Sequence, residues 1–326
     1  MFKQLINEYR INLSFSPCGP ILIKSGIAVA AGTNMAFVKT RRNGREEVYL
    51  PGSSLKGVIR AQGERIGRTL NEKAVCNPFN TKLTDPDNNP SPFGLPGCSD
   101  AFESIKKNKK REIFSYEAYQ GSCPICTLFG SLYLAGRFNI SDAYIDEKAE
   151  LPLLELRDCV GIDRFTGGVV NGANFDFEVI TSGEFHTAIT ITNFELWQIS
   201  LLCFILRDFE DELIPLGMGS SRGLGRIKAN VKSIQIDLIS TKTPTAIEGL
   251  GTLYQGKDRE KYGFDTENPL PLPTGAHFER AGIRQRMTIG PDQRHDFYQS
   301  VQDYFPTFIS NDRSMQKWRE DQELKQ

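Results

Sequence analysis

Four of the seven cysteines lie between residues 76 and 126, and their spacing suits a metal site. Cys123 and Cys126 form a CxxC pair of the kind found in zinc knuckles, whereas Cys76 and Cys98 lie upstream in a stretch rich in Pro, Asn, Asp and Gly. Four thiolates can close a tetrahedral structural zinc site, and metal binding would explain how a stretch with few apolar residues folds. A redox CxxC pair and scattered buried cysteines are the alternatives.

A glycine-rich segment at residues 217–226 has the composition of an anion-binding loop. Its four glycines allow the backbone to turn N–H groups toward an anion, and the guanidinium groups of Arg222 and Arg226 can hold phosphate. Ser220 and Ser221 add hydroxyl groups. The segment is neither a Walker A loop nor a GxGxxG motif, because no Gly-Lys-Ser/Thr ends it and a strand is expected to follow. The alternative is a tight connection between a helix and a strand.

A second candidate anion site lies at the start of the helix expected over about residues 53–70. Ser53 and Ser54 follow Pro51-Gly52, and the expected N-cap is a serine. A helix N-terminus with two hydroxyl groups attracts anions. Lys56 and Arg60 are four residues apart and therefore share a face. A solvated helix surface is the alternative.

A polar, Gly-rich segment at residues 160–168 is the fourth candidate. Arg164 could contact a phosphate while Phe165 wedges against a base, with Asp163 and Thr166 beside them. A plain extension of a β-hairpin is the alternative. No nucleophile–His–carboxylate set stands out among the three histidines, which disfavours a hydrolase triad.

The composition limits how the chain could bind nucleic acid and where it works. The net charge is −1, so a nucleic-acid site must be a local concentration of Lys and Arg. No secretory signal or stretch of about 18 apolar residues is present, which predicts a soluble, cytoplasmic protein without a membrane partner. Disulfides are not expected in that compartment. Cys18, Cys159 and Cys203 are interpreted as small core residues.

Hydrophobic periodicity predicts an α+β fold. A strand over residues 9–15, the helix over 53–70, a hairpin of strands at 173–180 and 185–192 joined by Ser182-Gly183, a helix over 194–208 capped by Asn193 and a strand over 224–238 give the order βαββαβ. This is a ferredoxin-like (RRM-like) core spanning residues 1–238, with an insertion at about 71–130. Residues 239–326 are expected to be an irregular extension with a terminal helix from Ser310.

These motifs, in this order, resemble the RAMP superfamily of CRISPR proteins, and most closely the single-domain backbone subunits of type III complexes, of the type III-D kind. The segments that carry the resemblance are residues 20–26, 51–60, 123–130, 161–167, 193–198 and 217–226. The resemblance implies partners: a CRISPR RNA guide, target RNA, other RAMP subunits and a polymerase-like large subunit. It also implies a thumb hairpin at about 155–174, which would push out a base. The residues implied to bind RNA are Lys24, Ser53, Ser54, Lys56, Arg60, Asp163, Arg164, Phe165, Thr166, Ser220, Ser221, Arg222 and Arg226.

The resemblance also bears on catalysis. Active members carry an Asp between the first strand and the first helix, whereas this chain has Asn34 at the matching position. An amide binds a divalent cation poorly and cannot act as a base, so weak or absent cleavage is expected at this site. One alternative is an endoribonuclease that uses magnesium and another carboxylate, such as Asp163. A second alternative is a zinc-containing protein-interaction module that never touches RNA.

Overall fold

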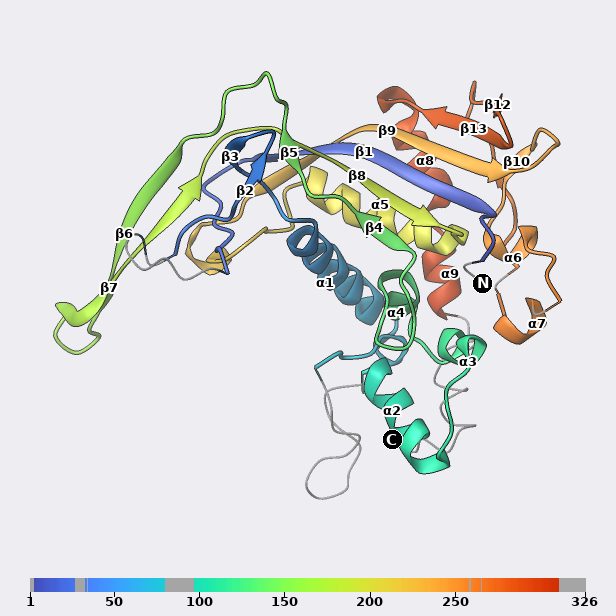
Figure 1. Cartoon of the computed structure of the whole chain (residues 1–326), viewed down its shortest axis with the longest axis horizontal. Helices are drawn as coiled ribbons and strands as arrows, with labels where there is room; N and C mark the ends of the chain where they lie inside the picture. The colour runs from blue at the N-terminus through green and yellow to red at the C-terminus, as the bar shows by residue number, and fades with distance from the viewer. Residues whose placement is uncertain are drawn as a thin grey trace.

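The computed structural model describes residues 3–26, 33, 35–79, 97–257, 259–264 and 266–310. Its main element is an antiparallel seven-stranded sheet in the order β12-β13-β9-β1-β8-β4, with β5 also paired to β8 (Figure 1). The strands of this sheet are β1 (Asn7–Pro17), β4 (Phe138–Ile140), β5 (Tyr144–Ile145), β8 (Phe185–Thr192), β9 (Ile227–Ile239), β12 (Glu279–Ala281) and β13 (Arg284–Ile289).

The centre of this sheet confirms the α+β, ferredoxin-like expectation. In chain order, β1, helix α1 (Gly52–Leu70), β4, β8, helix α5 (Leu196–Glu210) and β9 form a βαββαβ unit. Its strands lie side by side as the fourth, first, third and second. Figure 1 shows α1 and α5 on the same side of the sheet. Tyr9, Ile11, Leu13 and Phe15 of β1 are buried, which is the expected alternation.

The second strand of this unit is not the predicted one. The segment at 173–180 belongs to β7 (Val169–Ile180), which pairs with β6 (Leu154–Ile162) and not with β8. The predicted hairpin through Ser182-Gly183 is therefore wrong, and β4 takes the place beside β8. Strands β6 and β7 form a separate two-stranded hairpin, the β6–β7 hairpin, which projects from one end of the sheet (Figure 1). A second small hairpin, β2 (Lys39–Arg42) and β3 (Arg45–Val48), lies between β1 and α1.

Both helix caps differ from the sequence-based expectation. Pro51, and not a serine, is the N-cap of α1, and the side chain of Asp142 accepts the N–H of Gly52 at 2.7 Å. Asn193 adopts a φ of 55° and accepts the N–H of Ile6, so it does not cap α5. The Glu267 carboxylate instead accepts the N–H groups of Leu196 and Trp197. Long-range partners thus accept one free N–H group at the start of α1 and two at the start of α5.

The insertion at 71–130 is more regular than expected. It contains a short 3-10 helix (Glu72–Ala74) and the helices α2 (Cys98–Lys109), α3 (Ser115–Gln120) and α4 (Pro124–Phe129). Phe102, Ile105, Ile125 and Leu128 are fully buried and belong to the main hydrophobic core. The insertion therefore has an apolar core as well as its cysteines.

The C-terminal part is also not irregular. It contains β10 (Ala246–Ile247), α6 (Leu250–Leu253), α7 (Arg259–Tyr262), β11 (Leu270–Pro271), β12, β13, α8 (Arg294–Val301) and α9 (Tyr304–Ser310). Strand β13 pairs with β9, and Phe308 stacks on Trp197 of α5 with ring centroids 4.3 Å apart. The described residues between 240 and 310 thus share the core of the residues before them. The terminal helix predicted from Ser310 lies outside the described residues, since α9 ends there. Among the helices described, none combines the length and apolarity needed to cross a bilayer.

Candidate functional site

The cysteine cluster, made of Cys76, Cys98, Cys123 and Cys126, brings together the four predicted metal ligands. All four Sγ atoms lie within 4.8 Å of one another and all four residues are buried. The Sγ of Cys76 is 3.6 Å from that of Cys126 and 3.5 Å from that of Cys123. A tetrahedral zinc ion with Zn–S bonds of about 2.3 Å requires sulfur atoms about 3.8 Å apart. The cluster could therefore hold a metal ion such as zinc.

Local structure explains the position of these sulfur atoms. Cys123 is the N-cap of α4, and its Sγ accepts the N–H of Cys126 at 3.4 Å; the Sγ of Cys98 accepts the N–H of Cys123 at 3.2 Å. Burial raises the pKa of Cys123, but its hydrogen bonds with Cys126 and Cys76 more than offset this and lower it. The hydrogen bond to Cys123 raises the pKa of both Cys76 and Cys126. Metal binding would require the sulfur atoms as thiolates, which are the form that binds metal.

The remaining cysteines lie apart from the cluster. Cys203 is buried, as expected, and Cys159 is half-buried. Cys18 is exposed, so its interpretation as a core residue is wrong. Its backbone N–H pairs with the carbonyl of Arg226, which places it at the start of β9.

The start of α1 combines exposed hydroxyl groups with a partly engaged cation. Ser53 is exposed and Ser54 is half-buried. The Nζ of Lys56 donates to the carbonyl of Phe138 at 3.3 Å, and burial, followed by the charge of Arg60, lowers the pKa of Lys56. The Asp142 carboxylate already accepts the hydrogen bond of the Gly52 N–H, so a phosphate bound here would lie beside a negative charge. Ser53 is exposed and Ser54 and Lys56 are half-buried, and the Asp142 carboxylate reduces the attraction of this helix start for an anion.

Arg60 faces the cysteine cluster. Its Nη2 lies 3.3 Å from the Sγ of Cys126, its Nη1 donates to the carbonyl of Gly130 at 2.9 Å, and its Nε donates to Glu64 at 3.1 Å. Lys56 and Arg60, which were predicted to share a face, therefore have different neighbours: Lys56 contacts β4 and Arg60 contacts the cysteine cluster.

The glycine loop, residues 217–226, is exposed and anchored at both ends. Gly217, Gly219, Gly223 and Gly225 all have positive φ values. The N–H of Met218 donates to the carbonyl of Leu22 and that of Gly225 to the carbonyl of Pro20, both at 2.8 Å. A Cβ at Gly217 would lie 2.1 Å from the Leu22 oxygen, so only glycine fits there. The four predicted polar residues of the loop are exposed: Ser220, Ser221, Arg222 and Arg226.

The two arginines of the glycine loop differ in their surroundings. Arg226 donates to the carboxylate of Glu212 at 2.6 Å. The Cζ of Arg222 instead lies 5.7 Å from the ring centroid of Phe175 in β7. Leu224 from the same loop packs with Leu22 and with Phe177 and Val179 of β7. The glycine loop and the base of the β6–β7 hairpin therefore form one packed unit.

The turn of the β6–β7 hairpin is built around Asp163. Its carboxylate accepts the N–H groups of Phe165 at 2.7 Å and Thr166 at 2.9 Å, and these two bonds lower the pKa of Asp163. The Phe165 side chain is fully exposed, with a relative accessibility of 102%, and Arg164 and Thr166 are exposed beside it. The hairpin expected at 155–174 is present, with its tip at these residues.

The remaining predicted residues fall in the segment between β1 and α1. Lys24 is exposed and its backbone pairs with Phe37. Asn34 lies outside the residues that the structure describes.

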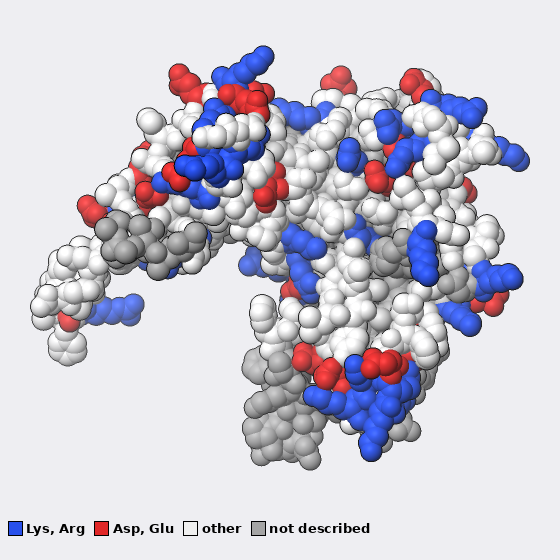
Figure 2. All heavy atoms as spheres, in the orientation of Figure 1, with Lys and Arg blue, Asp and Glu red and all other residues white. Residues whose placement is uncertain are grey.

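Figure 1 places the start of α1 and the glycine loop on the helix-bearing side of the sheet. Figure 2 shows Lys and Arg side chains on this side, over the position of α1, and intermixed basic and acidic side chains over α2.

Several contacts of this site were not predicted. Asp142, which takes the N–H of Gly52, and Phe175, which lies under Arg222, are distant in sequence from their partners. No local pattern marks these pairs. The alternation of Phe175 with polar residues indicated a strand but not its neighbours.

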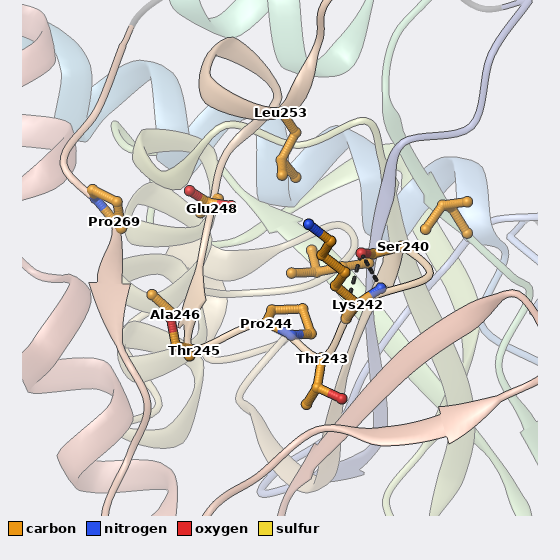
Figure 3. A pocket seen from close by; sticks show the side chains of 11 residues that line it. Ser240, Lys242, Thr243, Pro244, Thr245, Ala246, Glu248, Leu253 and Pro269 are labelled. Atoms are coloured by element: carbon orange, nitrogen blue, oxygen red, sulfur yellow. Dashed lines mark hydrogen bonds between the residues drawn. The ribbon is translucent and has the colours of Figure 1, made fainter.

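Two surface hollows accompany these elements. One of about 380 Å³ adjoins the cysteine cluster and is lined by residues that include Arg60, Cys76, Cys98, Cys126 and Leu132. The other, of about 500 Å³, lies in the C-terminal part between the end of β9 and Leu253, with Lys242 and Glu248 at its wall (Figure 3). None of the predicted RNA-binding residues lines this second hollow.

Comparison with known proteins gives one match. The family model described as "RAMPs: RAMP superfamily" matches residues 15–228, which include the last three residues of β1, the cysteine cluster, the β6–β7 hairpin and the whole glycine loop. No curated protein matches the chain.

Proposed function

The chain belongs to the RAMP superfamily, and we propose that it is a guide-binding backbone subunit of a type III CRISPR effector complex, of the type III-D kind. Members of this family are CRISPR-associated RNA-binding proteins that act in multi-subunit complexes, so a general role in binding CRISPR RNA follows from membership. The finer proposal concerns how this chain holds the guide and whether it cleaves the target.

The observation that carries the proposal is the packed unit of glycine loop and β6–β7 hairpin. Arg222 is exposed at the base of this hairpin, beside Ser220 and Ser221, and Phe165 is exposed at its tip. Cations and hydroxyl groups hold a ribose-phosphate chain without reading its sequence. An exposed aromatic ring can displace or stack on a base. In this proposal the loop grips the backbone of the guide and the hairpin acts as the thumb.

The start of α1 would make a second set of backbone contacts. The start of α1, which carries Ser53, Ser54 and Lys56, lies on the same side of the sheet as the glycine loop (Figure 1), and Lys24 is exposed between β1 and β2. In this proposal Asp142 limits how closely a phosphate approaches the helix start. The hydroxyl groups and Lys56 would therefore contribute more than the helix dipole.

The proposed subunit does not cleave target RNA. This part of the proposal rests on the sequence. Asn34 stands where active relatives are expected to carry Asp, and an amide is a poor ligand for magnesium. Asp163, the carboxylate considered as an alternative, directs both of its hydrogen bonds into its own turn. In a reconstituted complex with magnesium and matched target RNA, no cut should map to this subunit, and Asn34→Asp should create one. A cut by the wild-type subunit would establish the endoribonuclease alternative.

We further propose that the metal is zinc and that its role is structural. A set of four buried thiolates suits zinc and leaves no open coordination position for catalysis. The C-terminal part, residues 239–310, offers its surface, including the hollow of Figure 3, to neighbouring RAMP subunits or to a polymerase-like large subunit. The same proposal places the complex in the cytoplasm with its guide.

The direct test is salt-dependent binding of guide RNA. Lys56→Gln/Arg222→Gln should weaken binding at least about tenfold at moderate salt. It should also reduce the slope of log affinity against log salt by about 1–1.5, since each phosphate contact on single-stranded RNA contributes about 0.7.

The matched control removes the same charge from the opposite side of the sheet. Arg10 and Lys228 are exposed there, in alternation with buried neighbours on β1 and β9. Arg10→Gln/Lys228→Gln should leave the salt slope unchanged. Equal losses in the two double variants would mean that bulk charge governs binding. An absence of RNA binding by the wild type would favour the zinc-containing interaction module.

A further inference from the structure

Helix α1 presents three charged side chains to the cysteine cluster at intervals of four residues. Glu64 accepts hydrogen bonds from Arg60 at 3.1 Å and from Arg68 at 3.3 Å. Arg60 continues to Cys126 and Gly130, and Arg68 donates to the carbonyl of Cys76 at 2.7 Å. Residues four apart share a helix face. This face of α1 therefore contacts Cys76 through Arg68, and Cys126 and Gly130 through Arg60.

The contacts of Arg60 suit a metal-bound thiolate better than an RNA phosphate. Each of its three guanidinium nitrogens has a partner within the protein, and only 25% of its side chain is exposed. Three of its five N–H groups are thus already used within the protein, and its burial limits the access of a phosphate to the other two. Arg222, by contrast, is exposed and contacts an aromatic ring.

The negative charge of a zinc-bound cysteine cluster would give the contact between Arg60 and Cys126 a role. Four thiolates and one Zn²⁺ carry a net charge of −2, and the site is buried. Hydrogen bonds to the sulfur atoms disperse that charge and orient the ligands. The N–H groups of Cys123 and Cys126 supply two such bonds, and Arg60 supplies one that also brings a positive charge.

We propose that Arg60 is a positioning residue of the metal site and not an RNA contact. It donates a hydrogen bond to the metal-bound thiolate of Cys126. Metal binding therefore helps to fix the orientation of α1, and the first turn of this helix carries Ser53 and Ser54. This inference rests on the proposed metal function of the cluster. Loss of the metal would weaken the contact between Arg60 and Cys126 and loosen the support of α1.

The test compares zinc retention in Arg60→Gln, Arg60→Lys and Arg65→Gln. Arg65 is exposed on the same helix, so its substitution removes the same charge away from the cluster. In competition with a chelator, Arg60→Gln should bind zinc about 10–100-fold more weakly, which is the usual effect of losing a partner of a metal ligand. Arg60→Lys should recover part of the loss, and Arg65→Gln should match the wild type. The thiolate-to-metal absorption bands of the cobalt-substituted protein should shift in Arg60→Gln only.

Guide binding separates this inference from the proposed function. With zinc saturating, Arg60→Gln should bind guide RNA within about twofold of the wild type, because no phosphate contact is lost. Normal zinc retention together with a tenfold loss of RNA affinity would overturn the inference and make Arg60 an RNA contact. If the wild type itself takes up no zinc, the proposed metal function fails and the inference with it. If Arg60→Gln does not fold, Arg60→Lys decides by the same two measurements.

Discussion

The Cζ atom of Arg222 lies 5.7 Å from the ring centroid of Phe175, which joins the glycine loop to the base of the β6–β7 hairpin. A guanidinium over an aromatic ring is held weakly but in a defined place. Because the ring occupies one face of the guanidinium, its N–H groups remain in the guanidinium plane for a phosphate. This contact fixes where the glycine loop presents its charge relative to the hairpin.

Arg222→Gln should weaken guide binding more than Arg226→Gln. Arg226 is bound to Glu212 at 2.6 Å, so a phosphate would have to compete with a carboxylate for its guanidinium. Electrophoretic or fluorescence titration with single-stranded guide RNA at several salt concentrations measures both. The salt slope should fall by about 0.7 for Arg222→Gln and by less for Arg226→Gln. The reverse order would assign the phosphate contact to Arg226.

Asp163→Asn and Asp163→Ala should differ in their effect on the hairpin turn. The side-chain oxygen of Asn can still accept the N–H groups of Phe165 and Thr166, whereas Ala cannot. Asp163→Asn should therefore keep guide affinity and the pattern of target cuts, and Asp163→Ala should reduce guide affinity by loosening the tip. A target cut present in the wild-type complex and lost in Asp163→Asn would instead show a catalytic carboxylate.

Cys123→Ser should abolish metal binding and destabilise the protein. Loss of one of four ligands opens the site, and structural zinc contributes directly to folding. Elemental analysis of the purified protein should give about one zinc per chain for the wild type and close to none for the variant. Cys18→Ser is the control, since Cys18 is exposed and outside the cluster. Retention of zinc by Cys123→Ser would exclude the four-cysteine site.

Gly217→Ala should destabilise the glycine loop more than Gly223→Ala. Both glycines have positive φ values, 88° and 81°, so either substitution should cost about 1–2 kcal/mol of backbone strain. A Cβ at residue 217 would also lie 2.1 Å from the Leu22 oxygen, whereas nothing lies within 4 Å at residue 223. We expect about 1–3 kcal/mol of additional destabilisation for Gly217→Ala. Equilibrium unfolding in denaturant measures the difference, and equal values would argue against the packing of this loop on Leu22.

Asp237 should stabilise the protein in a pH-dependent manner. Burial raises the pKa of Asp237, but hydrogen bonds from Arg286 and the charges of Arg286 and Arg284 more than offset this and lower it. A carboxylate whose pKa is lower in the folded state stabilises that state above the unfolded pKa of about 3.9. This stabilisation is lost as the pH falls through the folded value.

Asp237→Asn should therefore unfold about 1–3 kcal/mol more easily than the wild type at pH 7. The difference should shrink as the pH drops from about 5 to below 3. Asp292→Asn, at an exposed position, is the control and should change stability little. A difference that stays constant over this range would mean that Asp237 acts through packing and not through its charge.

Much of the fold is encoded in short-range patterns. Alternation of apolar and polar residues predicted β1, β8 and β9, and helical periodicity predicted α1 and α5, because these patterns depend only on which side of an element is buried. The pairing of β7 with β6 and of β4 with β8 was not predictable in this way. Alternation marks a strand but does not specify its neighbour.

The same division applies to the site. Residue type and spacing alone predicted the group of four cysteines and singled out the glycine loop with its two arginines, since these depend on local chemistry, and the resemblance to the RAMP superfamily implied the hairpin that carries Phe165. Tertiary structure alone decided that Arg60 faces Cys126. It also decided that Asp142 accepts a backbone hydrogen bond at the start of α1 and that Glu267 accepts two at the start of α5. A hydrogen bond between residues distant in sequence is set by how the elements pack, and no local pattern contains that information.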